Sequence, residues 1–411
     1  MVALDLPDKN EVSEPVPTAA AGTGVSGPAI LQILPALDEG GAKRGAIDLA
    51  RHLVGRGWGA LVISGGGPGE TELESFGACS FRLPVNSTNP FTIRANVRRL
   101  QRLIREHGVH LVHVRSRAPA WSAYQAARRC HVPFVTTIHG VYERARGILR
   151  RDYNRVMARG DRVIAVSDYV AEHVRQHYGV PPERLRMIHR GIDMTRFDPA
   201  AVELSRVDAV AAQWRVPPGA RLVLVPSMVG RRNHRLLLHA IDRLARRDFL
   251  CLIFGSFEQD GKYAVETEGL IGALGLGSVA RLVVPCQDMP AALMLADVVV
   301  VPANGAAEPL SRVSVQAQAM GKPVILTDVG GLGETLMPAA TGWLVAPGDP
   351  EALANALELA LAMPDEVRAR LAARARRFVS RNFSLEQTGE ATMRVYRELL
   401  EGPVSDADGI V

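Results

Sequence analysis

The stretch 308–334, EPLSRVSVQAQAMGKPVILTDVGGLGE, indicates how the second half of the chain folds. Small and apolar residues recur from Val313 to Met320. Gly321-Lys322-Pro323 then ends this predicted helix, because glycine favours the position after a helix and proline cannot continue one. Residues 323–327 predict a buried strand, and a turn with Gly330-Gly331 follows. This succession of loop, helix, strand and glycine turn is typical of a ligand site at the carboxyl edge of a parallel sheet.

Glu308 and Gln316 are the polar residues of this stretch best suited to contact a ligand. They lie eight residues apart, a little over two helical turns, so both can face the same ligand from the first turns of one helix. Leu310 and Ser311 are expected in the first helical turn, where backbone N–H groups can meet the oxygens of an anionic ligand. The Glu308 carboxylate can accept hydrogen bonds from the hydroxyl groups of a ligand.

Length and composition limit the class of protein. The chain has 411 residues, of which 47% are hydrophobic, and this is enough for two globular domains. Its four cysteines have neither metal nor redox spacing, which fits a reducing cytoplasm. No apolar run reaches the roughly 18 to 20 residues of a membrane span. Residues 1–26 lack a signal-peptide pattern and are expected to be a disordered lead-in, and residues 402–411 a disordered tail.

The net charge of +5 is concentrated in the first half, where residues 27–215 hold 28 Lys or Arg against 17 Asp or Glu. Six of these arginines follow one predicted helix: Arg144, Arg146, Arg150, Arg151, Arg155 and Arg159. A solvated helix surface and a contact with an anionic membrane or a lipid-linked acceptor both fit this pattern. Nucleic acid is not an expected partner, because the basic residues are not interleaved with aromatics and no binding motif is present.

Apolar runs alternate with amphipathic segments along the whole chain. The runs predicted as strands are 29–35, 59–64, 111–114, 132–139, 161–168, 222–225, 249–254, 280–284, 296–301 and 323–327. Such alternation predicts parallel, doubly wound sheets. We expect an N-terminal Rossmann-like domain at 27–200, a linker at 201–220, a second such domain at 221–382 and a C-terminal helix at 383–401.

Two features lie where strands of the first domain would end. Gly40 and Gly41 stand between the first strand and a helix, so their backbone N–H groups can approach an anion, although a purely structural turn fits equally well. His139 closes the run 132–139. A lone histidine is usually a satisfied turn residue, but its place at a strand's carboxyl end favours a functional role.

The stretch 308–334 resembles the donor-sugar motif of glycosyltransferase family 4, in which a Glu, seven residues and a second Glu precede a helix that ends in Met-Gly-x-Pro-Val. Glu308 matches the first Glu, and Met320-Gly321 matches the helix end, while Gln316 stands at the second Glu. The run 188–198 resembles the family's Ile-Pro-x-Gly-Val-Asp signature between the domains, with His189 in place of the proline. The likeness extends from about residue 30 to residue 400.

This resemblance implies the GT-B architecture, in which two Rossmann-like domains with parallel sheets face each other across a cleft. The first domain would hold the acceptor and the second the nucleotide-sugar donor, and the last helix would cross back to the first domain. The implied reaction is a retaining transfer of a hexose from a nucleotide diphosphate sugar to a glycan or lipid-linked acceptor, often in lipopolysaccharide or surface polysaccharide synthesis. No metal and no cofactor other than the donor is implied. The expected location is the cytoplasm or the inner face of its membrane.

The resemblance also implies roles for individual residues. His139 and Glu308 would be catalytic and hold the donor sugar. The implied donor-binding set is Gly40, Gly41, Arg231, Arg232, Asn233, Cys286, Gln287, Leu310, Ser311 and Gln316. Within this set the glycine pair would admit the phosphates, and the segment with Cys286 would pass the nucleotide base.

Three departures from the family leave turnover open. The Arg and Lys that bind the donor diphosphate in the family correspond to Met228 and Asn233, and Gln316 is a neutral amide. Arg231 and Arg232 adjoin the vacated positions, and their guanidinium groups suit phosphate, although a solvent-facing position fits equally well. The alternative is a catalytically degenerate protein that binds a sugar nucleotide or a partner. An epimerase of this architecture fits less well, because its acid and base residues are not apparent.

Overall fold

The computed structural model describes residues 27–38, 41–141, 154–226, 231–255, 257–303 and 308–401. Residues 41–42, 231–233 and 257–260 are described by their backbone alone. The expected lead-in at 1–26, the expected tail at 402–411 and the arginines from Arg144 to Arg151 lie outside these ranges.

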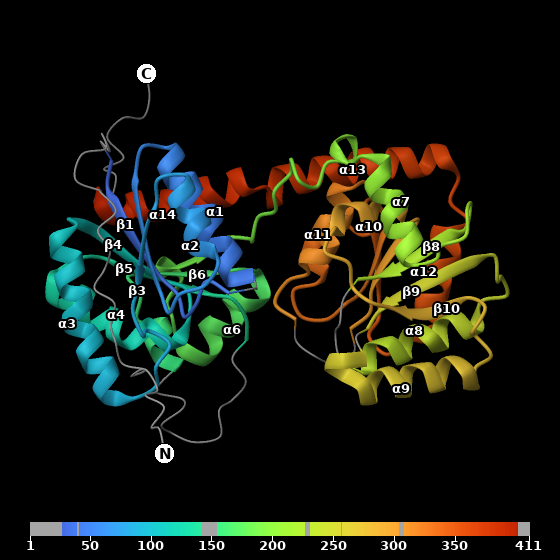
Figure 1. The fold of residues 1–411 in the computed structure, drawn as a ribbon, viewed down its shortest axis with the longest axis horizontal. Helices are drawn as coiled ribbons and strands as arrows, with labels where there is room; N and C mark the ends of the chain where they lie inside the picture. The colour runs from blue at the N-terminus through green and yellow to red at the C-terminus, as the bar shows by residue number, and fades with distance from the viewer. Residues whose placement is uncertain are drawn as a thin grey trace, which may run out of the picture. The chain divides into compact units, whose positions relative to one another are not determined.

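Two sheets organise the described chain (Figure 1). The first has the order β3-β2-β1-β4-β5-β6-β7, with β1 at Ala29–Ile33, β2 at Gly59–Ser64, β3 at Cys79–Arg82, β4 at Val109–Val114, β5 at Phe134–Ile138, β6 at Arg162–Ala165 and β7 at Leu185–Met187. The second has the order β10-β9-β8-β11-β12-β13, with β8 at Arg221–Val225, β9 at Phe249–Phe254, β10 at Ala280–Val283, β11 at Val298–Val301, β12 at Val324–Thr327 and β13 at Gly342–Val345.

Both sheets repeat one topology. The pairings among β3, β2, β1, β4 and β5 are parallel, as are all pairings of the second sheet. In each sheet the strand order reverses once, between β1 and β4 and between β8 and β11. These are the topological switch points, where the loops at the carboxyl ends of the strands leave room for a ligand.

Helices cover the strands on both sides (Figure 1). Their bounds are α1 Gly41–Gly55, α2 Gly69–Ser75, α3 Pro90–Glu106, α4 Arg117–Cys130, α6 Asp168–Tyr178, α7 Leu204–Gln213, α8 Arg231–Arg243, α9 Phe257–Ala273, α10 Met289–Leu295, α11 Arg312–Ala319, α12 Pro350–Leu361, α13 Asp365–Phe383 and α14 Leu385–Leu400. Around the first sheet α1 packs with α2 and α3 with α4. Around the second, α8 packs with α9 and α12, α7 packs with α10, and α11 packs with α13.

The second sheet is apolar on both faces. Alternate residues of β8 point to opposite sides, so Leu222 and Leu224 join one hydrophobic cluster while Val223 and Val225 join the other. β9, β11 and β12 divide their side chains in the same way. Strands buried on both faces are continuously apolar, and this explains why the sequence predicted β9 with the bounds that the structure gives it.

Contacts divide the chain into two compact units. The first contains residues 1–137, 146–163 and 395–411, and the second contains residues 138–145 and 164–394. α14 therefore begins in the second unit and ends in the first. The sequence-based domain boundaries stay a prediction.

The parallel, doubly wound sheets expected from the sequence are confirmed. The strands β3, β7 and β13 were not predicted. The residues of β3 and β7 are at least partly exposed and give no apolar run, and β13 is only four residues long. At the end of the expected arginine-rich helix, residues 154–155 are helical and Val156–Ala158 continue as a 3-10 turn. Arg159 lies over the rings of Trp121 and Tyr124, at 5.2 and 5.6 Å from their centroids. Within the described ranges no helix combines the length and the apolar character that crossing a bilayer requires.

Candidate functional site

Glu308 lies in the loop after β11, seven residues beyond the end of that strand, at the switch point of the second sheet. The helix that follows begins at Arg312, so the expectation that Leu310 and Ser311 form its first turn is wrong. The physical reason is a cap. Ser311 has extended backbone angles, and its hydroxyl accepts a hydrogen bond from Ser314 N at 3.1 Å, as an N-cap residue does. Leu310 packs against the hydrophobic core instead.

The glycine turn after β12 supports the Glu308 loop. Gly331 N donates a hydrogen bond to the Glu308 carbonyl at 2.8 Å. Gly330 has a φ of +59°, and a Cβ on it would lie 2.3 Å from that same carbonyl oxygen. Only glycine fits this contact, because a larger residue meets both the left-handed backbone penalty and a backbone clash. The two ends of the stretch 308–334 thus form one structural element.

The Glu308 side chain is partly buried, and this burial raises the pKa of its carboxyl. Among the described residues none donates a hydrogen bond to that carboxylate. Gln316 lies in the second turn of α11, is half-buried, and likewise has no side-chain hydrogen-bond partner in the described part of the chain. Both groups are therefore placed to accept or donate hydrogen bonds with a ligand.

His139 directly follows β5, at the carboxyl end of that strand, and is partly exposed. The next residue, Gly140, packs near the Glu308 loop, since a Cβ on it would lie 3.7 Å from Pro309 Cγ. Within the second unit the structure thus brings the turn with His139 and the loop with Glu308 side by side. Their roles in catalysis stay a prediction.

A second carboxylate near this loop was not identified from the sequence. The Glu334 side chain accepts hydrogen bonds from Asp168 N at 2.7 Å and Tyr169 N at 2.8 Å, the first two residues of α6. Its Oε2 also lies 3.3 Å from His189 Nε2, and the His189 ring stacks on Phe383. His189 is the residue that replaces the family's proline.

The partners of Glu334 determine its charge state. Burial alone would raise the pKa of its carboxyl, but the hydrogen bonds from His189 and from the two backbone N–H groups outweigh this and hold the pKa below its ordinary value. A carboxylate at a helix N-terminus also interacts favourably with the helix dipole. Glu334 is therefore a paired, structural carboxylate, unlike Glu308.

The segment expected to pass the nucleotide base follows β10. Gln287 is exposed, and Cys286 is half-buried, which raises the pKa of its thiol. Asp288 caps α10 by accepting from Ala291 N at 3.2 Å, and Arg206 of α7 holds the same carboxylate through two hydrogen bonds of 2.7 and 2.8 Å. The hydrogen bonds from Arg206 keep the pKa of Asp288 below its ordinary value. A surface pocket of about 520 Å³ lies between α7 and residues 285–288.

For the expected phosphate-binding residues the structure describes the backbone at most. Gly40 and Met228 lie outside the described residues, and Gly41 is the first residue of α1. Arg231, Arg232 and Asn233 open α8, but only their backbone is described. The replacement of the missing cations by Arg231 or Arg232 therefore stays a prediction.

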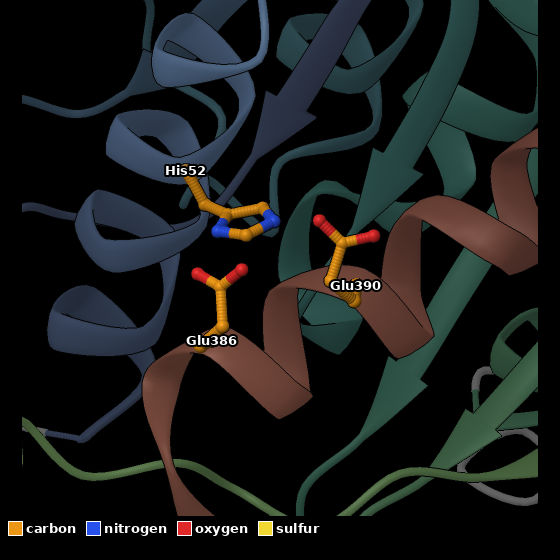
Figure 2. Close-up of side chains that lie close together, drawn as sticks. All are labelled: His52, Glu386 and Glu390. Carbon is orange, nitrogen blue, oxygen red and sulfur yellow. The ribbon is translucent and has the colours of Figure 1, made fainter.

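Glu386 and Glu390 lie one turn apart on α14, and Figure 2 shows both carboxylates on the same side of that helix. With His52 of α1 they are the one set of His, Cys, Asp or Glu side chains, among residues that the structure describes, that could supply three metal ligands. His52 belongs to the first unit and both glutamates to the second, so we propose no metal site from them.

Sequence comparison finds two family models that match successive parts of the chain. Glycosyltransferase Family 4 matches residues 39–196, and Glycosyl transferases group 1 matches residues 212–378. A D-inositol 3-phosphate glycosyltransferase of Saccharomonospora viridis is 33% identical over 259 residues, which cover 60% of this chain. The match covers 57% of that relative's length.

Solved structures resemble nearly the whole chain. A glycosyltransferase from Rickettsia africae has 32% sequence identity and a TM-score of 0.83, and the match covers 92% of this chain and all of the other. The Anabaena protein HepE, solved in complex with UDP and glucose, has 21% identity and a TM-score of 0.74, with 90% of this chain covered and all of HepE. The second likeness shows the fold alone, and both agree with two parallel α/β sheets.

Proposed function

The chain belongs to the glycosyltransferases of family 4 and group 1, and on this premise we propose that it transfers a hexose from a nucleotide diphosphate sugar to an acceptor hydroxyl with retention of configuration. The position and surroundings of Glu308 carry the proposal. Glu308 is a partly buried carboxylate at the switch point of a parallel sheet, and no described residue donates to it. A group in that state gains hydrogen bonds when a polyhydroxylated ligand arrives, so it favours a sugar over an apolar molecule.

The proposed chemistry rests on positioning rather than on an added cofactor or metal. Glu308 accepts hydrogen bonds from donor-sugar hydroxyls, and the adjacent His139 turn limits where the sugar can lie. Holding the acceptor hydroxyl next to the reacting carbon, on the face from which the diphosphate departs, lowers the entropic cost of their encounter and fits retention. Negative charge develops on the departing diphosphate, and cations or helix N-termini at that place lower the barrier. Arg231 and Arg232 are the proposed cations.

For the donor and the acceptor we propose chemical classes and no single compound. HepE was solved with UDP, so uridine diphosphate sugars are the first donors to test. The Saccharomonospora relative is named for D-inositol 3-phosphate, which makes a small phosphorylated polyol one acceptor class. A glycan or lipid-linked acceptor in surface polysaccharide synthesis, at the inner face of a membrane, is the other.

The test is a panel of nucleotide diphosphate sugars offered to the full chain, with release of the nucleoside diphosphate as the readout. We expect at least one donor to be turned over, slowly with water alone and faster with a small polyol phosphate or an oligosaccharide. Glu308→Gln should abolish most of this release. Glu366→Gln is the matched control, because Glu366 is an exposed glutamate of α13. Equal rates in the Glu308→Gln variant and the native chain would contradict the proposal.

The degenerate alternative rests on Gln316, the neutral amide where the family has a carboxylate. It predicts that a donor binds, by calorimetry, without any release of nucleoside diphosphate. Gln316→Glu would then restore turnover. In an active enzyme the same change would alter the rate by about tenfold or less, since one charge-assisted hydrogen bond is exchanged for a neutral one.

A further inference from the structure

Arg115 is the first residue after β4, at the switch point of the first sheet between β4 and β1. Its backbone N donates to the Ile33 carbonyl at 3.2 Å, so its position at the end of the neighbouring strand β1 is fixed. The side chain is largely buried. Its Nε is fully buried, and no described residue accepts a hydrogen bond from it.

The side chains around Arg115 do not neutralise its charge. His113, two residues earlier, is fully buried between Tyr396 Oη at 2.6 Å and Thr137 Oγ1 at 2.7 Å. Burial and the nearby Arg115 charge lower the pKa of His113 well below its ordinary value, so His113 is neutral. The Asp48 carboxylate acts on Arg115 through its charge, which raises the pKa of Arg115 against the larger effect of burial, but it forms its ion pair with Arg44 at 2.6 Å.

A buried N–H such as Arg115 Nε–H without an acceptor costs the fold free energy, because it has lost its water and gained no hydrogen bond. Burial accordingly lowers the pKa of Arg115 from its ordinary value. A buried donor of this kind calls for a partner, which a water, an ion or a ligand can supply. Arg115 thus offers a donor that an anionic ligand can satisfy.

The backbone around Arg115 is also suited to an anion. α4 begins at Arg117, and its N-cap residue Ser116 makes no capping hydrogen bond with its side chain. The first N–H groups of α4 therefore lie two residues from Arg115 with no side-chain cap, and a helix N-terminus attracts negative charge. The guanidinium itself lies against Gly45 of α1. A Cβ on Gly45 would lie 2.8 Å from Arg115 Nη2, so glycine leaves the space that the side chain occupies.

We propose that Arg115 and the N-terminus of α4 form a binding site for a phosphate-type oxyanion that one of the two substrates carries. The identity of the ligand as a substrate rests on the proposed transferase function, whereas the anion site itself does not. Two sources share this chemistry, a phosphorylated acceptor and the donor diphosphate. All of the residues involved belong to the first unit.

The first experiment titrates inorganic phosphate into the full chain and follows binding by calorimetry and by the shift in Tm. In Arg115→Gln we expect the Kd for phosphate to rise about 10- to 100-fold, which is what the loss of a charge-assisted hydrogen-bonding group produces. Arg102→Gln is the control, because Arg102 is an exposed arginine of α3 with one distant ion pair of 3.9 Å. An unchanged Kd in Arg115→Gln would overturn the proposal.

The second experiment separates a ligand-binding role from a structural one. Arg115→Met, measured in buffer without phosphate, should raise the Tm, since an unpaired charge is replaced by an apolar side chain of similar length. A lower Tm would show that Arg115 holds the fold together and would overturn the proposal. Gly45→Ala keeps the charge but displaces the guanidinium, so it should weaken phosphate binding while the protein stays folded.

Titration with UDP identifies the source of the anion. If Arg115→Gln weakens UDP and phosphate by the same factor, the donor diphosphate occupies the site. If UDP binding is unchanged and phosphate binding falls, the acceptor carries the anion. Neither readout requires turnover. If sugar transfer is normal but phosphate binding does not depend on Arg115, only this anion site is rejected. If phosphate binding depends on Arg115 but no sugar is transferred, only the transferase function is rejected.

Discussion

The two sheets have the same strand order but opposite charges at equivalent places. Arg115 follows β4 of the first sheet, and its buried Nε has no acceptor among the described residues. Glu308 follows β11 of the second sheet, and its carboxylate has no donor there. Burial lowers the pKa of Arg115 and raises the pKa of Glu308, so it favours the neutral form of each group. The first edge suits an anion and the second suits hydroxyl groups, so one topology presents two kinds of binding group.

A comparison within the second unit makes the same point. Glu334 and Glu308 lie in two loops that pack together, yet Glu334 has three hydrogen-bond donors and a lowered pKa, while Glu308 has a raised one. Paired charges hold these loops in place. Unpaired charges at the same sheet edge are the candidates for contact with substrate, and mutation can test this division.

Replacing Glu308 should have the largest effect on activity. We expect Glu308→Gln to lower kcat/KM for sugar transfer by about 10²-fold or more, the usual loss when one preorganised polar group is removed from a reaction centre. Initial rates of nucleoside diphosphate release measure this effect. A loss of less than about threefold would remove Glu308 from the proposed site.

The Gly330 turn should have the next largest effect, on stability and activity together. Gly330→Ala should lower the free energy of unfolding by at least about 2 kcal/mol, because Ala is strained at a φ of +59° and its Cβ meets the Glu308 carbonyl. Urea unfolding measures this. Gly269→Ala is the matched control. Gly269 lies inside α9, and a Cβ on it would meet no heavy atom within 4 Å. Gly269→Ala should therefore raise the free energy of unfolding by about 1 kcal/mol, because Ala favours a helix interior over Gly.

The two glutamates should respond to pH in opposite directions. The folded-state pKa of Glu334 is depressed, so its stabilisation is present above the ordinary value of 4.5 and is lost as pH falls through the folded pKa. Glu334→Gln should therefore reduce stability at neutral pH, by about 1 kcal/mol for a charge at a helix N-terminus, and should matter less in acid.

For Glu308 the sign is reversed. Its folded-state pKa is raised, so the penalty for its charge is absent below 4.5 and is complete once pH exceeds the folded pKa. Glu308→Gln should be more stable than the native chain at neutral pH and equal to it in acid. Denaturant unfolding of both variants at several pH values checks the contrast, and parallel profiles would contradict it.

The smallest expected effect concerns the segment that follows β10. Arg206→Ala frees Asp288 but leaves the α10 cap in place, and the ion pair is partly exposed to solvent. Since exposed ion pairs contribute little, we expect the KM for the donor to rise by less than about tenfold with kcat unchanged. A fall in kcat with unchanged KM would place Arg206 in the reaction and not in the support of a binding loop.

The sequence predicted those parts of the fold that have a strong local signal. β9 is apolar at every position and was found with its bounds, as was the place of His139 directly after β5. α1 begins at Gly41, so this glycine belongs to the helix and not to the turn expected before it, because the first turns of α1 carry glycine and basic residues instead of an apolar pattern. Ser311 is a recognisable N-cap residue, and this signal could have corrected the start of α11.

The charge states of the site could not be predicted in this way. Arg115 was visible in the sequence only as one arginine among many, because its lack of an acceptor depends on the packing of Gly45 and on the neutral state of His113. Glu334 needs α6 and His189 to become a paired carboxylate. Such pairing is a tertiary property. The resemblance to a family located Glu308 but not its difference from Glu334.

Proton NMR of the anomeric signals during reaction tests the central claim most directly. The full chain is mixed with a nucleotide diphosphate sugar and an acceptor, and the donor and product signals are followed over time. The account predicts that the donor signal declines, that a product with the same anomeric configuration appears, and that Glu308→Gln slows this at least about 10²-fold. A donor that binds tightly and stays intact in the native chain would contradict the account and support a binding protein with a glycosyltransferase fold.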